Sequence, residues 1–202
     1  MSSPRRFLWA AVALVAVATP PLAAQRYVAR RPSAFYFTGG IGGGTFTPVC
    51  DTGCFGDALN ANNVLLVVGW ALSPRLRVEG GWQYQGAVGD AGQGSHVASL
   101  TVGVAAYPVG NLFFRGGVSQ LNLSVVDSVG VTEGKGGPAF TVGVGYDLFL
   151  SRTFAITPYA NYFRGTLKNL SYSTVSTITT SGTVSALNGG ISFTYRGLRM
   201  RP

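Results

Sequence analysis

The sequence has few charged residues and no long disordered or repetitive stretch. Charged residues make up 11% of the 202 residues, against about a quarter in a typical soluble domain. A disordered chain is excluded because hydrophobic residues reach 47%. A collagen-like chain is excluded because the 29 glycines follow no three-residue repeat. The length fits one domain, and its charge-poor composition favours a membrane environment.

The basic excess does not indicate nucleic-acid binding. The formal net charge is +8, but the lysines and arginines are scattered and form no run or basic helix. A nucleic-acid interface needs its cations gathered on one face. We therefore expect no nucleic-acid partner.

Beyond the N-terminus, the sequence lacks the run of about 20 apolar residues that a membrane-spanning helix needs. The apolar segment Phe7–Ala18 is shorter, follows Arg5 and Arg6, and precedes Leu22-Ala23-Ala24, which offers a small-residue cleavage site. This is the three-part pattern of a secretory signal peptide. We expect residues 1–24 to be cleaved on export, with an uncleaved anchor as the alternative.

Cysteine and histidine are also scarce. Cys50 and Cys54 form a C-x3-C motif, and export would carry them to an oxidising compartment, where a disulfide is expected. The alternative is a metal site, to which Asp51 and Asp57 would have to contribute. We predict the disulfide, no metal and no cofactor.

The rest of the chain is rich in segments where apolar and polar residues alternate. Between residues 75 and 85, the even positions are apolar, aromatic or glycine, and the odd positions are mostly polar or charged. This period of two is the signal of a half-buried β-strand. Eight such segments occur, each long enough for a tilted membrane-spanning strand. They are 34–46, 62–73, 75–86, 96–107, 111–125, 138–150, 153–166 and 184–197.

The fifth segment is the least regular, because its apolar positions change face near Gln120. This predicts a bulge or emergence from the membrane. The connections alternate strictly between short and long. Short turns occur at 73–74, 108–110 and 150–152, and long loops at 47–61, 87–95, 126–137 and 167–183. Bacterial outer-membrane barrels have short periplasmic turns and long extracellular loops.

The residue types decide which face meets lipid. A soluble barrel would carry many charges on its polar face, but here that face is mostly Gly, Ser, Thr, Ala and Asn. Small residues suit the narrow lumen of eight strands, so the apolar face is predicted to contact lipid. Aromatic residues are expected to form two girdles at the membrane interfaces. They are Phe35, Phe37, Phe149, Phe154, Phe193 and Tyr195 at one level, and Trp82, Tyr84, Phe140 and Tyr162 at the other.

These features resemble the small eight-stranded bacterial outer-membrane β-barrel family, similar to the barrel domain of outer membrane protein A and to OmpX. The resemblance covers residues 34–197 and is carried by the strand pattern and by segments such as Phe140 to Leu148 followed by Thr157-Pro158-Tyr159. It implies an all-β, eight-stranded antiparallel up-and-down transmembrane β-barrel in a Gram-negative outer membrane. Residues 25–33 would be a periplasmic lead-in.

The C-terminus departs from this family, in which many members end on an aromatic residue used in assembly. Here Tyr195 precedes a tail at 198–202. Either Tyr195 serves in assembly despite the tail, or assembly differs.

The polar face places five charged side chains in the lumen. They are Arg77, Glu79, Arg115, Asp147 and Arg196. Buried charges need partners, so we expect a network that closes the barrel. The alternative is a charged constriction in a narrow, porin-like pore, which the arginines would make anion-selective.

A lipid A-modifying enzyme is a third hypothesis, because small barrels resembling deacylases and palmitoyltransferases use a histidine with a serine. The candidates are His96, Ser95 and Ser99, with Asp90 as an acidic neighbour. His96 and Ser99 should point to opposite faces of their strand. We therefore expect no enzymatic activity.

We expect a structural or surface-interaction protein that displays four extracellular loops. Its expected partners are outer-membrane lipid and lipopolysaccharide, the outer-membrane assembly machinery and an extracellular protein at the loops. The Ser- and Thr-rich loop at 167–183 could extend its hairpin as a surface for β-augmentation. We expect a monomer.

Overall fold

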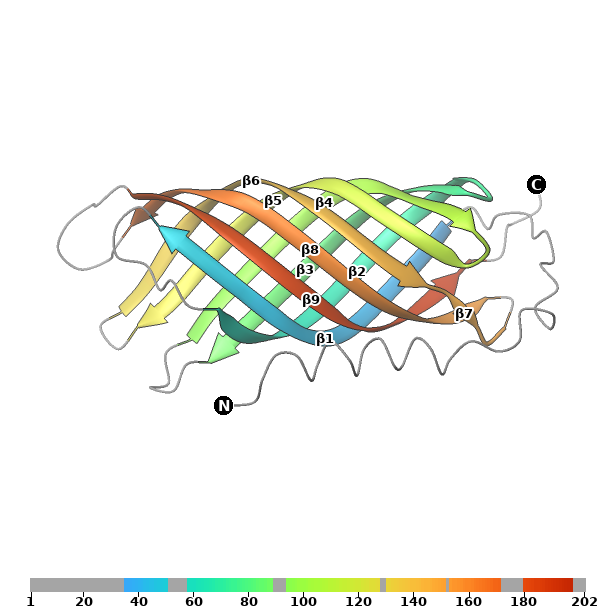
Figure 1. Ribbon diagram of the computed structural model, residues 1–202, viewed down its shortest axis with the longest axis horizontal. Helices are drawn as coiled ribbons and strands as arrows, with labels where there is room; N and C mark the ends of the chain where they lie inside the picture. Colours follow the sequence, from blue (N-terminus) through green and yellow to red (C-terminus); the bar gives the residue numbers. More distant parts are fainter. Residues whose placement is uncertain are drawn as a thin grey trace. The chain divides into compact units, whose positions relative to one another are not determined.

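The computed structural model describes residues 35–50, 58–88, 94–127, 130–151, 153–171 and 180–197. The predicted signal peptide lies outside these residues. Within them, no helix is long and apolar enough to cross a membrane. The alternating segments form antiparallel strands, which are shown in Figure 1. They are β1 (Phe35–Cys50), β2 (Leu59–Ser73), β3 (Leu76–Val88), β4 (Gly94–Val109), β5 (Leu112–Asp127), β6 (Gly130–Tyr146), β7 (Leu148–Phe149), β8 (Phe154–Ser171) and β9 (Thr180–Arg196).

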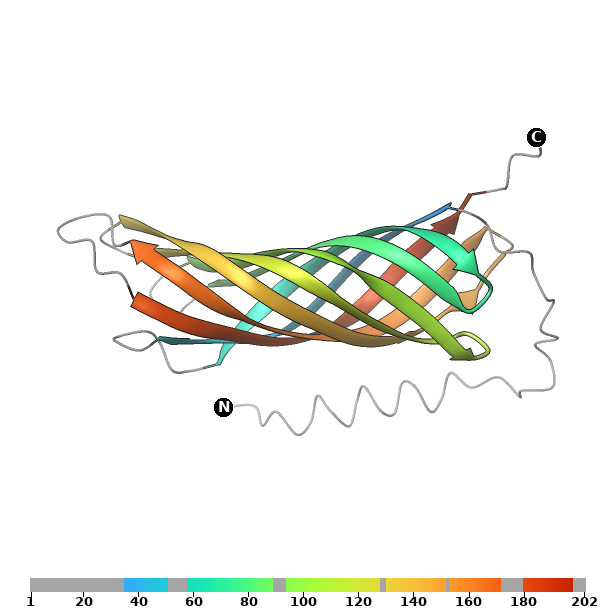
Figure 2. The ribbon, with the colours of Figure 1, turned by 90° about the horizontal axis from the view of Figure 1, so that it is seen from above.

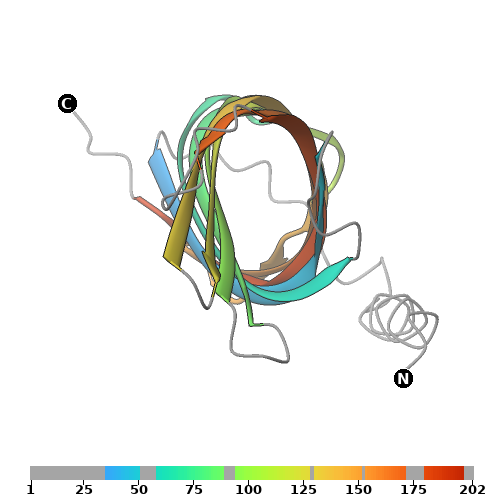
Figure 3. The ribbon, with the colours of Figure 1, turned by 90° about the vertical axis from the view of Figure 1, so that its left-hand side faces the viewer.

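The strands close into a barrel, which Figure 3 shows from one end. Each long strand pairs with its neighbours in sequence, and β1 pairs with β9 to complete the ring. The two-residue β7 continues β6 beyond Asp147, and both pair with β8. The wall therefore has eight strands, and the predicted fold class is confirmed.

Three tight turns gather at one end of the barrel, where β1 starts and β9 finishes (Figure 2). We call this the turn end and the opposite one the loop end. Gly110 has a φ of 54°, which glycine adopts without steric cost. The Ser73 hydroxyl accepts a hydrogen bond from the Arg75 amide at 3.2 Å, and Ser151 does the same for the Phe154 amide at 3.0 Å. Serine side chains thus satisfy backbone groups in two turns.

The strands run further toward the loop end than the sequence predicts. β6 begins at Gly130 rather than 138, and β8 continues to Ser171 rather than 166. The prediction of a loop at 126–137 is wrong, because most of it belongs to the β5–β6 hairpin. Ladder hydrogen bonds use only backbone groups, so a paired neighbour extends a strand through polar and glycine-rich sequence.

The outer and inner faces exchange polarity at one level of the barrel, which we call the polarity boundary. Toward the loop end, the outward side chains become polar or charged. The changes are Val64 to Asn62 in β2, Val118 to Gln120 in β5, Tyr162 to Arg164 in β8 and Leu187 to Ser185 in β9. At the same level the lumen becomes apolar. The changes are Asn63 to Ala61, Ser119 to Leu121, Asn161 to Phe163 and Asn188 to Ala186.

This exchange explains the irregular fifth segment. Through Gln120, β5 keeps its alternation, with Leu121 and Leu123 buried inside and Asn122 outside. The backbone irregularity lies across the ladder. Between the pairs Gln120–Pro138 and Leu123–Gly134, one extra residue belongs to β6. The apolar positions of β5 change from the outer to the inner face because the lumen becomes apolar and the outer face polar beyond the boundary.

Glycines line the seam between the first and last strands. Gly42 pairs with Gly190, and Gly44 pairs with Asn188. A Cβ atom on Gly42 or Gly44 would collide with the backbone of β9. This seam therefore requires glycine, because the two backbones approach too closely for side chains.

Candidate functional site in the barrel lumen

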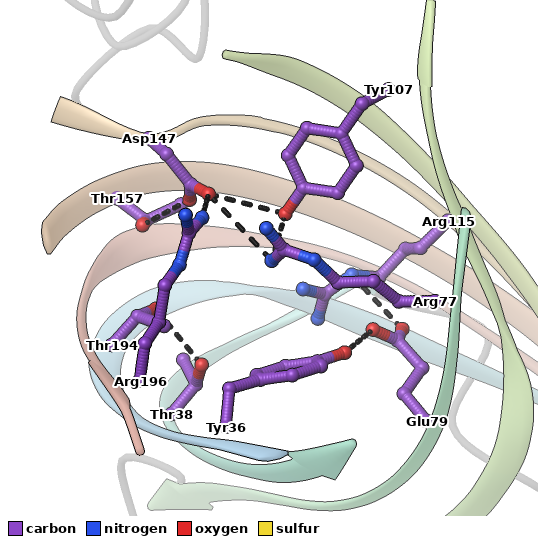
Figure 4. A network of polar contacts seen from close by, with 10 residues as sticks. All are labelled: Tyr36, Thr38, Arg77, Glu79, Tyr107, Arg115, Asp147, Thr157, Thr194 and Arg196. Carbon is purple, nitrogen blue, oxygen red and sulfur yellow. Dashed lines mark hydrogen bonds and ion pairs between the residues drawn. The ribbon is translucent and has the colours of Figure 1, made fainter. Parts of the chain in front are cut away.

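Asp147 is the centre of a polar network in the turn-end half of the lumen (Figure 4). Its Oδ2 atom accepts hydrogen bonds from the Tyr107 hydroxyl at 3.1 Å and from Arg196 at 2.5 Å. Its Oδ1 atom accepts one from Thr157 at 2.7 Å. Arg77 Nη1 lies 3.8 Å from Oδ2. Asp147 is 1% exposed, and its charge is compensated by these donors.

Glu79 is the second buried carboxylate of the network. The Tyr36 hydroxyl donates to Glu79 Oε2 at 2.8 Å, and Arg115 Nε lies 3.4 Å from Oε1. Arg77 donates to the Tyr107 hydroxyl. The guanidinium of Arg77 also lies 4.1 Å from the centroid of the Tyr107 ring and 5.0 Å from that of Tyr36. The two tyrosines therefore connect the carboxylates to the arginines by hydrogen bonds and cation–π contacts.

The strand register explains why these side chains meet. Arg77 and Arg115 both pair with Ala105, so they flank one small residue on the inner face. Gly69 pairs with Tyr36, and a Cβ atom there would collide with the tyrosine ring. The missing side chain is what allows the Tyr36 ring to lie across β2.

All five charged residues predicted for the lumen occur together in this network. Sequence reasoning missed Tyr36 and Tyr107, which are buried and tie the network together. The sequence contained the signal, because Tyr36 lies two residues from Thr38 and Tyr107 two residues from Ala105. Residues two apart in a strand share a face, which here is the lumen face. The prediction places aromatic side chains only at the two lipid-facing girdles, so it has no place for tyrosines in the lumen.

The loop-end half of the lumen is filled by an apolar plug that the sequence did not predict. Its members are Phe46, Ala61, Ala87, Val97, Leu121, Leu123, Ala139, Phe163, Leu167, Val184 and Ala186. Phe46 and Leu121 are fully buried, and Phe163 is nearly so. The plug side chains are buried against one another, as in a protein core.

A belt of amide side chains separates the plug from the network. It consists of Asn63, Gln83, Gln85, Asn161 and Asn188, all buried. Along β3 the order is Glu79 in the network, Gln83 and Gln85 in the belt, and Ala87 in the plug. The Asn63 amide donates to the Tyr159 hydroxyl at 2.7 Å. The lumen is thus occupied by side chains in three successive layers.

The structure does not assemble the predicted enzyme candidates. The His96 ring stacks on Tyr84, with centroids 5.6 Å apart, and lies on the outer face. Ser95 and Ser99 are buried in the lumen. Asp90 lies outside the described residues. Among those residues, no group of three or more His, Cys, Asp or Glu could hold a metal ion.

The predicted cysteine pair cannot be placed, because Cys54 and the side chain of Cys50 lie outside the described part. Most predicted girdle residues face outward. Near the turn end these are Phe35, Phe37, Phe154, Phe193 and Tyr195, and near the polarity boundary Trp82, Tyr84, Phe140 and Tyr162. Phe149 differs, since its ring contacts the Arg196 guanidinium at 4.2 Å. It covers an end of the network.

Comparisons with known proteins identify the fold. No family model matches the sequence, and no curated protein matches it. Among solved structures, Neisserial surface protein A (NspA) superposes with a TM-score of 0.59 at 9% identity, over 81% of this chain and 97% of NspA.

Two weaker matches are Ail, the attachment invasion locus protein of Yersinia pestis, and OprG from Pseudomonas aeruginosa. Ail has a TM-score of 0.45 at 11% identity, over 79% of this chain and 99% of Ail. OprG has a TM-score of 0.40 at 13% identity, over 83% of this chain and 98% of OprG. With its closed ring and apolar outer belt, and with the NspA match, the chain is an eight-stranded β-barrel of the bacterial outer-membrane type.

Proposed function

We propose that the protein is a closed outer-membrane anchor that presents its loop end at the cell surface for contact with partners. The observation that carries this proposal is the filled lumen. A solute path would have to cross the apolar plug and then the Asp147 network, which lie at different heights. A wide aqueous channel needs many more strands than eight.

The polarity boundary supports an orientation with the loop end outside. In β8 the outward apolar stretch runs from Phe154 to Tyr162, and Arg164 follows. Nine tilted residues span about 20 to 23 Å along the barrel axis, close to the apolar band of about 25 Å in such barrels. The wall beyond Arg164 would project from the membrane, with polar residues outside and the plug as its core.

The projecting wall and the four connections that leave it are the surface we assign to partner contact. An extracellular protein at the loops is the partner class that fits an exposed polar rim. Outer-membrane lipid and lipopolysaccharide would surround the apolar belt, and the outer-membrane assembly machinery would insert the barrel. We propose that the barrel acts as a monomer.

Planar-bilayer recording of the purified full-length protein tests the closed anchor. We expect no steady conductance from the wild type. Phe163→Ala and Phe46→Ala together remove two plug rings and should raise the frequency of conducting events. Phe140→Ala with Phe154→Ala, on the lipid face, is the matched control and should stay silent. Steady wild-type conductance that Arg115→Gln abolishes would instead establish the narrow pore.

Surface presentation is tested separately, with an epitope tag inserted between residues 171 and 180. Intact cells should bind the antibody, and a tag in the 150–153 turn should bind it only after the outer membrane is opened. The reverse result would mean that the barrel has the opposite orientation.

A further inference from the structure

The polar network carries more positive than negative charge. Three arginines, Arg77, Arg115 and Arg196, share two carboxylates, Glu79 and Asp147. No other acidic side chain lies in the lumen among the described residues whose side chains are placed. The network therefore has one uncompensated positive charge, which is costly in a protein interior.

Both carboxylates are already engaged. Glu79 accepts from Tyr36 and lies beside Arg115, and Asp147 accepts from Tyr107, Thr157 and Arg196. Asp147 thus accepts three hydrogen bonds, and Glu79 accepts one and forms one ion pair. Among the five charged side chains, the buried groups without a hydrogen-bond partner are both donors, the Nε–H groups of Arg115 and Arg196, whereas the unpaired acceptors belong to the amide belt. A further ligand here would therefore have to accept hydrogen bonds.

A small cavity lies among these groups. Its volume is about 10 Å³, which is room for about one water molecule. Arg77 and Arg115 line it from either side of Ala105, together with hydroxyl-bearing residues such as Thr38 and Thr194. The carboxylates Glu79 and Asp147, each already engaged by arginine and hydroxyl groups, also line it. Figure 4 shows the guanidinium groups of Arg77 and Arg115 in the same region of the lumen, with Arg77 directed to Tyr107 and Asp147 and Arg115 directed to Glu79.

We propose that this cavity binds one halide ion, chloride in the cell, between the guanidinium groups of Arg77 and Arg115. The charge and the hydrogen-bonding preference of chloride each match one observation, and its monoatomic form suits the small volume. A single negative charge neutralises the excess of one. Chloride is somewhat larger than the water-sized space, so the arginine side chains must give slightly to admit it, whereas phosphate or sulfate would overfill the cavity. Chloride only accepts hydrogen bonds, so it satisfies the arginine donors and needs no acceptor of its own. Water would also donate, and would therefore need acceptors that the carboxylates already provide to other groups.

The test measures how chloride affects the unfolding of the full-length folded barrel in detergent. Urea unfolding is compared in 0.5 M sodium chloride and in 0.5 M sodium gluconate, whose anion is too large for the cavity. For a dissociation constant of about 50 mM, chloride should lower the unfolding equilibrium constant about tenfold. Equal unfolding in the two salts would overturn the site.

Two variants separate site binding from a general salt effect. Arg115→Gln removes one positive charge, which leaves the network balanced, and it should abolish the chloride dependence. Arg164→Gln removes an exposed arginine on the outer face and should keep the full tenfold difference. A chloride effect of the same size in both variants would contradict the proposal.

A second measurement does not depend on the folding of Arg115→Gln. Wild-type crystals grown in sodium bromide should show one anomalous bromide peak between Arg77 and Arg115. The absence of a peak there would overturn the proposal. The site is independent of the surface role, because a closed anchor and a narrow pore would each contain the same cavity.

Discussion

The two halves of this barrel share one wall but have opposite cross-sections. On the turn-end side of the polarity boundary, the outside is apolar and the lumen holds the Asp147 network. On the loop-end side, the outside is polar and the lumen holds the plug. The first arrangement suits lipid and the second suits water, because each places its apolar side chains away from water. One β-sheet thus has the side-chain distribution of a membrane barrel in one half and that of a soluble barrel in the other.

The largest expected effect comes from removing the central charge of the turn-end half. Asp147→Asn leaves three buried arginines with one carboxylate and should lower the free energy of unfolding by about 3 to 5 kcal/mol. Urea unfolding followed by heat-modifiability on a gel measures the loss. Arg75→Gln, in the exposed β2–β3 turn, is the control and should change little. A loss below about 1 kcal/mol for Asp147→Asn would show that the network contributes little to stability.

The plug in the loop-end half should respond to loss of volume. Leu121→Ala leaves a cavity in a packed core and should cost about 2 to 5 kcal/mol. The matched control is Leu100→Ala on the neighbouring strand β4, where the leucine is 62% exposed and adjacent lipid can fill the space. Urea unfolding of both variants gives the comparison. Equal losses would mean that Leu121 is not enclosed as the structure shows.

A charge placed on the outer wall locates the membrane. Val102 is 67% exposed and lies on the turn-end side of the boundary. Val102→Arg should destabilise the barrel by about 2 to 4 kcal/mol in lipid. Asn122→Arg, outward on β5 beyond the boundary, should cost about 0 to 1 kcal/mol. The measurement is unfolding from lipid vesicles. If the two costs are similar, the polarity boundary does not mark the edge of the hydrocarbon.

The smallest effect is expected at His96, on the outer face near the boundary. His96→Ala loses a ring contact with Tyr84 and should cost about 0.5 to 1 kcal/mol. The lipid A profile of cells expressing this variant should match that of wild-type cells. If lipid A is modified only in cells that express the wild-type protein, the lipid A-modifying enzyme hypothesis replaces the closed anchor.

The sequence predicted the wall of the barrel because alternation survives in every environment. All eight strands lie where the period of two placed them, and the short turns at 73–74, 108–110 and 150–152 were recognised from their length and chemistry. The side chains predicted to face lipid point outward in the turn-end half, as at Leu100 and Val102.

The loop-end half could not be predicted by the same rule. Alternation separates two faces but does not say which one meets water, and one assignment was applied to the whole chain. Beyond the boundary this assignment fails, as Phe46, Leu121 and Phe163 show. The five charged lumen residues were found by residue type, whereas their contacts depend on register between strands distant in sequence. Asp147 and Arg196, for example, are 49 residues apart.

The glycine seam between β1 and β9 has a consequence for how the barrel persists. Thr38 and Thr194, which meet across it at 2.9 Å, are 156 residues apart in the chain. Closing so long a loop is slow because its entropy is lost before the contacts form. Once closed, however, the sheet has no free edge from which a strand can peel. We expect the lifetime of the folded barrel to be set by the barrier to reopening this seam. The barrel would then unfold more slowly than its free energy of unfolding alone suggests.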